Sequence, residues 1–151
     1  MTTILEKDQY ILIYRVSYLS LFSSMYALYK RHSNLAMVPG SVFLTSIFYW
    51  QHPDYSYRRY LDMIVVQCAL LYQYSMAYHA QYANAYYTLT NAGICFYIIG
   101  YYFSLHQDSW KSTYAHILLH IFANIGNIVL YSGNIRLPIK DESTLSSNTS
   151  T

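Results

Sequence analysis

The feature that most constrains the fold is a long run without any Asp, Glu, Lys or Arg, from Met63 to Gln107. Two further uncharged runs cover residues 32–53 and 112–135. A helix that crosses a bilayer needs about 20 mostly apolar residues, so the first run is long enough for two crossings. The runs do not alternate with a period of two, as the strands of a membrane barrel do. The sequence therefore predicts an all-α, polytopic integral membrane bundle.

The composition fits this class once tyrosine is taken into account. Charged residues make up 11% of the 151-residue chain, against about 25% in soluble domains. Mean hydropathy is only +0.13 because 20 residues are tyrosine, whose hydroxyl lowers the average. A tyrosine ring with one polar tip suits bilayer interfaces and the seams between helices. A net charge of +2, without a basic patch, indicates that nucleic acid is not a partner.

Five membrane-spanning helices are predicted, near residues 10–29, 35–50, 61–79, 84–105 and 113–131. Residues 1–135 then form one transmembrane domain. Residues 136–151 form a polar tail that we expect to be disordered. The third and fourth spans are separated by YHAQYANAYY, which contains no Gly or Pro to mark a turn. A single long, tilted helix is therefore an alternative there.

Polar residues gather at one face of the predicted bundle. Counting crossings places the N-terminus, the loop near residues 51–60 and the loop near 106–111 on the same side. Polar groups that enter a bilayer tend to face the bundle interior, so this face is the candidate site. Arg15 and Asp62 lie at similar depth, and we expect a structural ion pair between them, with a gating or catalytic pair as the alternative.

The last predicted helix carries a polar stripe. His116 and His120, in HILLH, are four residues apart, and Asn124 and Asn127 continue the same face. Two histidines at this spacing can bind one metal ion. The same stripe can form hydrogen bonds between helices around a close contact of small residues. Both interpretations stay open at this point.

Three segments together resemble a known pattern. Ser46 lies late in the second span with His52 just after it, RRYLDM places Asp62 at the start of the third, and HILLH opens the last. This resembles the CREST superfamily of membrane hydrolases, which includes alkaline ceramidases and the progestin and adiponectin receptors. The resemblance implies a zinc ion held by His52, His116 and His120, with Ser46 and Asp62 as catalytic residues. The chain departs from the family in two ways. The family has seven helices, and Trp50 stands four residues after Ser46, where the family has histidine.

The leading hypothesis is a non-enzymatic structural or accessory subunit of a membrane assembly, without a cofactor. Its partners are the lipid bilayer and other protein subunits. The loop QHPDYSYRRY, with His52, Asp54, Arg58 and Arg59, is the expected contact. The chain is similar in character to small polytopic proteins in the internal membranes of large DNA viruses and to accessory subunits of organellar complexes.

Two other hypotheses remain. One is a zinc-dependent hydrolase of lipid amides, as the CREST resemblance implies. The other is an ion or proton pathway that uses Arg15, Asp62, His116 and His120. A pathway needs polar residues in both halves of the membrane. The sequence places most of them in one half, with Asn124 and Asn127 in the other.

Overall fold

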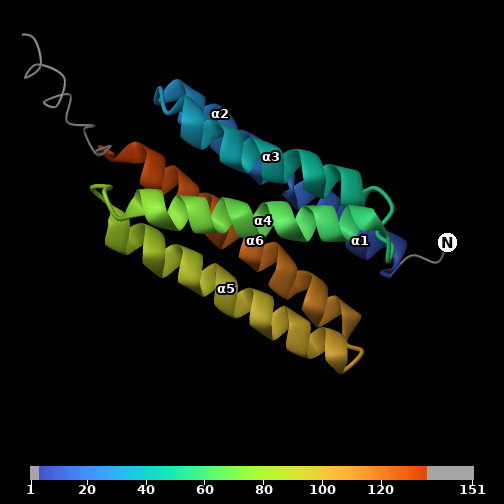
Figure 1. Ribbon diagram of the computed structural model, residues 1–151. Coiled ribbons are helices and arrows are strands. Elements are labelled where there is room, and N and C mark those ends of the chain that lie inside the picture. Colours follow the sequence, from blue (N-terminus) through green and yellow to red (C-terminus); the bar gives the residue numbers. More distant parts are fainter. Residues whose placement is uncertain (1–3, 136–151) are drawn as a thin grey trace, which may run out of the picture.

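The computed structural model describes residues 4–135, and this part of the chain is helical throughout apart from short turns. The tail prediction for residues 136–151 lies outside the described residues. Six helical segments follow one another along the chain (Figure 1): α1 (Lys7–Val16), α2 (Tyr18–Tyr29), α3 (Ser33–Trp50), α4 (Tyr57–Ala77), α5 (Ala83–Leu105) and α6 (Ser109–Ser132). The predicted all-α class is confirmed.

Local interactions explain the helix boundaries. α1 begins with a capping box, in which the Glu6 and Gln9 side chains bond to each other's backbone N–H. α1 and α2 meet at Ser17, whose hydroxyl donates to the Ile13 carbonyl at 3.0 Å, so the two form one interrupted rod. α4 and α5 are separate helices, because the chain turns between Ala77 and Ala83. The single-helix alternative for this stretch is therefore wrong.

The helices pack as antiparallel neighbours. α3 packs between α2 and α4, while α5 and α6 lie against each other along their length (Figure 1). Gly93 and Gly100 of α5 and Gly126 of α6 line this seam, where an added Cβ would meet the opposite helix within 3.1–3.5 Å. Such small residues let helix backbones approach closely. α4 packs mainly on α3 and touches α5 only sparsely.

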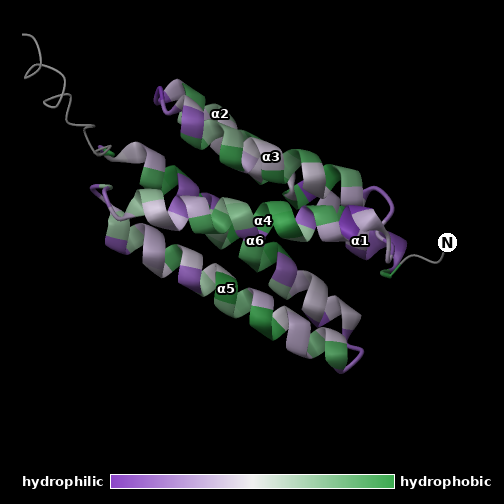
Figure 2. Cartoon of the chain, viewed as in Figure 1, coloured by the Kyte–Doolittle hydropathy of each residue, from purple (hydrophilic) through white to green (hydrophobic). Residues whose placement is uncertain are grey.

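The interior of the bundle holds both apolar core clusters and many polar side chains, while large apolar side chains are exposed. The buried positions include many polar residues: Gln9, Ser23, Ser46, Asp62, Gln73, Thr90, His120, Asn124 and Asn127. Large apolar side chains are exposed on the outside, among them Phe22, Met25, Leu44, Ile64, Leu71 and Ile98. Figure 2 shows hydrophilic residues concentrated at the turns and hydrophobic stretches between them. Two helices, Lys7–Tyr29 and Ser109–Ser132, are long and apolar enough to cross a membrane.

Candidate functional site

A partly open cavity of about 450 Å³ lies between α4 on one side and α5 and α6 on the other, and α2 and α3 also line it. Its middle wall is apolar and includes Val42, Val66, Leu70, Ile94 and Leu119. Polar side chains line both ends. We call the end near the α3–α4 loop the Asp62 end (Ser46, Asp62, His116, His120), and the end near the α4–α5 turn the Gln73 end (Gln73, Tyr86, Thr90, Asn127).

The Asp62 end joins α3, α4 and α6. The Asp62 carboxylate is buried and accepts hydrogen bonds on one oxygen from Thr45 and Ser46, each at 2.8 Å. The His116 and His120 rings lie on the same face of α6 with centroids 5.0 Å apart. Four predicted site residues, Ser46, Asp62, His116 and His120, are thus brought to one end of one cavity.

The predicted ion pair between Arg15 and Asp62 does not form. Arg15 is exposed on α1, and the ion pairs among the described residues are Asp54–Arg58 and Asp108–Lys111. The hydroxyls of Thr45 and Ser46 take the place that the arginine was expected to fill. The prediction failed because it compared only how far along their helices Arg15 and Asp62 lie. It did not consider which face of α1 carries the Arg15 side chain.

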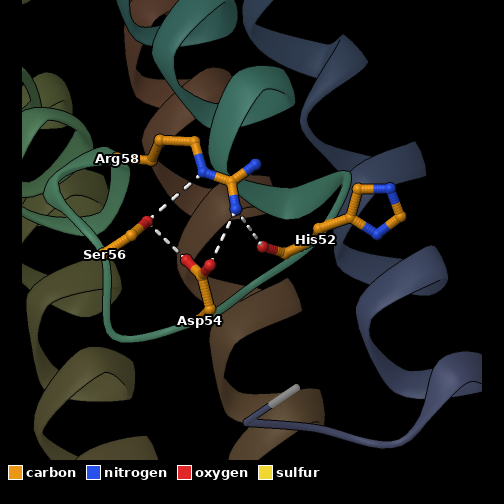
Figure 3. A network of polar contacts seen from close by, with 4 residues as sticks. All are labelled: His52, Asp54, Ser56 and Arg58. Carbon is orange, nitrogen blue, oxygen red and sulfur yellow. Dashed lines mark hydrogen bonds and ion pairs between the residues drawn. The ribbon is translucent and has the colours of Figure 1, made fainter. Parts of the chain in front are cut away.

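His52 stays in the α3–α4 loop and does not fold back to the cavity. Its side chain is exposed, and Figure 3 shows its ring pointing away from the neighbouring polar network. One turn after Ser46, at the position where the CREST pattern has histidine, Trp50 packs its ring edge-on against His116, with centroids 5.1 Å apart.

The donor set at the Asp62 end does not fit zinc. A catalytic zinc ion needs three protein ligands, and the candidates there are Asp62, His116 and His120, of which the Asp62 carboxylate is engaged by Thr45 and Ser46. Among the described residues no group of three or more His, Cys, Asp or Glu side chains is placed to hold a metal ion.

The α3–α4 loop is held in a fixed shape by its own charges (Figure 3). Arg58 donates to the Asp54 carboxylate at 2.9 Å and to the His52 carbonyl at 3.0 Å, and Ser56 donates to Asp54. The Ser56 hydrogen bond, followed by the Arg58 charge, holds the pKa of Asp54 below its usual range. Arg59 stacks on the ring of Tyr55 at 5.0 Å. Three of the four predicted loop residues therefore have structural partners within the loop.

The polar stripe of α6 divides into two parts. Asn124 accepts from Ser23 at 2.7 Å and donates to the His120 carbonyl at 2.7 Å, which ties α6 to α2. Asn127 is buried, lines the cavity, and forms no side-chain hydrogen bond within the described part of the chain. Of the two interpretations of this stripe, the interhelical hydrogen bond is observed for Asn124.

Sequence reasoning predicted only Asn127 of the Gln73 end and missed Gln73, Tyr86 and Thr90. Gln73 donates to the Tyr131 hydroxyl, while the buried hydroxyls of Tyr86 and Thr90, one turn apart on α5, are without a partner among the described residues. The spacing of Tyr86 and Thr90 and the two glutamines of α4, Gln67 and Gln73, were available signals. Only the packing of α4, α5 and α6 shows that these side chains meet.

The fold and site define an all-α helical bundle with a partly open cavity that is polar at both ends. Comparisons with protein-family models, with curated proteins and with solved structures found no match.

Proposed function

We propose that this chain is a multi-pass membrane protein and that it acts as an accessory subunit of a membrane assembly. The observation that carries the first part is the combination of many buried polar residues with many exposed large apolar residues. In water this arrangement exposes apolar surface, whereas in lipid it buries that surface and hides the polar groups.

The helix lengths and the aromatic residues support a bilayer of ordinary thickness. Helices α3 to α6 have 18, 21, 23 and 24 residues, which corresponds to about 27 to 36 Å, close to the hydrocarbon core. Most of the exposed tyrosine and tryptophan residues lie toward the two ends of the bundle, as in the aromatic belts of membrane proteins, while Tyr18 and Tyr97 lie nearer its middle. Those toward the ends include Tyr57, Tyr60, Tyr101, Trp110 and Tyr114 at one end and Tyr29, Tyr78 and Tyr82 at the other.

The α3–α4 loop supports the role of a subunit. Its internal ion pair and hydrogen bonds fix its shape, yet Tyr55, Tyr57 and Tyr60 are 75%, 70% and 64% exposed. Rigid, exposed tyrosines are enriched at protein interfaces because they bury much area at little entropic cost. The loop lies at the end of the bundle, where a partner outside the hydrocarbon core can reach it.

Purification from the native membrane in a mild detergent tests this function. We expect a stoichiometric partner that is lost from the Tyr55→Ala/Tyr57→Ala double variant. Tyr29→Ala, which removes an equally exposed ring at the opposite end, should keep the partner. A wild-type protein that purifies alone as a monomer contradicts the proposal.

A membrane hydrolase is the second candidate, favoured by the meeting of Ser46, Asp62, His116 and His120 at one cavity end. Among the described residues, Asp62, His116 and His120 are not placed to hold one metal ion together, which counts against it. The test is the zinc content of purified protein. About one zinc per chain, lost in His120→Ala, supports the hydrolase, and the absence of bound zinc excludes this zinc-dependent form.

A further inference from the structure

The Gln73 end of the cavity has hydrogen-bonding groups without partners. Asn127 lines the cavity and its amide is unpaired within the described residues. Gln73 uses its amide N–H on Tyr131, which leaves its carbonyl oxygen available. The buried hydroxyls of Tyr86 and Thr90 make no hydrogen bond to any other described residue, although the two lie close enough to interact with each other. Buried polar groups are normally hydrogen-bonded, so this cluster requires a further molecule to complete it.

The chemistry of this end selects an uncharged group. Its four side chains are amides and hydroxyls, which donate and accept hydrogen bonds without carrying charge. The carboxylate and imidazoles of the lining lie at the opposite end, and the lining contains neither Lys nor Arg. An anionic carboxylate or phosphate therefore has no counter-charge in the cavity, and burying it would be costly.

The rest of the cavity suits an apolar chain. The middle wall is mostly aliphatic, with Gln67 and Tyr97 at its exposed margin, and a volume of about 450 Å³ falls in the range that holds one small ligand. Gln73 lies one turn before the end of α4, and Asn127 lies just over one turn before the end of α6. A head group at these residues is therefore near the level of the membrane interface, and a chain attached to it extends toward the bilayer centre.

The cavity also has a side opening that faces lipid. Met63 of α4 and Ile98 of α5 line the cavity and are 44% and 60% exposed. They lie where α4 and α5 make few contacts, so the opening is between these two helices. A molecule dissolved in the bilayer can enter there without crossing water.

We propose that the cavity binds one single-chain, uncharged lipid with a hydroxyl-bearing head group, held at Gln73, Tyr86, Thr90 and Asn127. A monoacylglycerol has this chemistry: its diol and ester match the hydroxyls and amides of the site, and its chain matches the aliphatic wall. The proposal rests on the bundle lying in a bilayer. It assigns a ligand site at the end of the cavity opposite the two histidines.

Photolabelling tests the proposal. Protein in phosphatidylcholine nanodiscs is mixed with a monooleoylglycerol analogue that carries a diazirine in mid-chain, and the labelled peptides are identified by mass spectrometry. We expect saturable labelling on α4, α5 and α6. Unlabelled monooleoylglycerol should compete at least tenfold better than oleate, which has the same chain and a negative head group.

Variants locate the head group. Tyr86→Phe/Thr90→Val, which removes two hydroxyls, should weaken labelling about three- to tenfold, as expected for lost neutral hydrogen bonds. Ala69→Phe, which places a ring in the cavity lining, should abolish it. The control is Tyr101→Phe/Thr88→Val, the same chemical change at exposed α5 positions, and it should label as wild type.

Three results overturn the proposal: no saturable labelling of protein that has entered nanodiscs, equal competition by oleate, or equal labelling of the cavity and control variants. Failure of the protein to enter nanodiscs at all would instead contradict the proposed membrane function, so the two failures are distinguishable.

Discussion

Several buried polar side chains on the helices of this bundle form hydrogen bonds to neutral side chains on other helices, and not ion pairs. The Asp62 carboxylate is held by two α3 hydroxyls, and Asn124 of α6 by Ser23 of α2. The sequence allowed His116, His120, Asn124 and Asn127 to be assigned to one interior stripe, because their spacing follows the helical period. It did not reveal Thr45 or Gln73 as partners, because those contacts depend on how separate helices rotate about their axes.

Removal of one hydroxyl should reveal the importance of the Asp62 contacts. Ser46→Ala leaves a buried carboxylate with one donor fewer, so we expect the free energy of unfolding to fall by about 1–3 kcal/mol. Ser41→Ala is the control, since this exposed α3 serine bonds only to the Val38 carbonyl, and we expect a change within about 0.5 kcal/mol. The measurement is unfolding in mixed micelles with increasing SDS. Equal effects of the two substitutions would show that the Ser46 bond does not stabilise the fold.

The lowered pKa of Asp54 predicts that the α3–α4 loop is sensitive to acid. Because the folded pKa lies below the unfolded value of about 3.9, the stabilisation is complete above that value. It is lost as the pH falls through the folded pKa. A dye on Tyr55→Cys, in a background without Cys68 and Cys95, should lose anisotropy below about pH 4. Adding Asp54→Asn should give low anisotropy at every pH. If the Asp54→Asn protein still shows a pH-dependent change in anisotropy, a group other than Asp54 causes that change.

At the scale of whole helices, sequence patterns predicted five rods and came close to their ends. The predicted spans 10–29 and 84–105 correspond to α1 with α2 (Lys7–Tyr29) and to α5 (Ala83–Leu105). The turn between α4 and α5 carries no Gly or Pro. Part of its anchoring comes from a distant segment, because the Gln81 N–H donates to the Asn134 carbonyl at 2.9 Å and the Gln81 side chain accepts from the Asn134 N–H at 3.2 Å. Such an anchor cannot be seen in the local sequence.

Alanine substitutions at Gly133 and Gly93 should differ in their effect on stability, because the space for an added Cβ differs between the two sites. An added Cβ at Gly133 would lie 2.8 Å from the Tyr82 ring, whereas one at Gly93 meets its nearest neighbour, the Leu119 carbonyl oxygen, at 3.5 Å. Gly133→Ala should therefore lower the free energy of unfolding by about 1–3 kcal/mol as the α4–α5 turn shifts. Gly93→Ala should be neutral or stabilise by up to about 1 kcal/mol through helix propensity. The reverse order in thermal melts would contradict the observed packing.

For the molecule as a whole, composition alone did not reveal how many polar residues are buried and how many large apolar residues are exposed. Within residues 4–135, two rods are long and apolar enough to cross a membrane, and the mean hydropathy of α3, α4 and α5 is lowered by their polar residues and tyrosines. The cavity could not be predicted either. It exists because α4 packs on α3 and makes few contacts with α5, which local sequence does not show. The sequence predicted several polar groups near one end of the bundle, and the structure adds a second set near the other end of the cavity.

Cysteine labelling in sealed vesicles tests the multi-pass arrangement most directly. Single cysteines are introduced, without Cys68 and Cys95, at five positions. Tyr55→Cys and Gln107→Cys report on one end of the bundle, Arg31→Cys and His79→Cys on the other, and Leu71→Cys on the exposed middle of α4. The account predicts that a membrane-impermeant maleimide labels one pair in intact vesicles and the other pair only after permeabilisation, while Leu71→Cys stays unlabelled. Labelling of both pairs in intact vesicles, or of Leu71→Cys as fast as the loop positions, would contradict it.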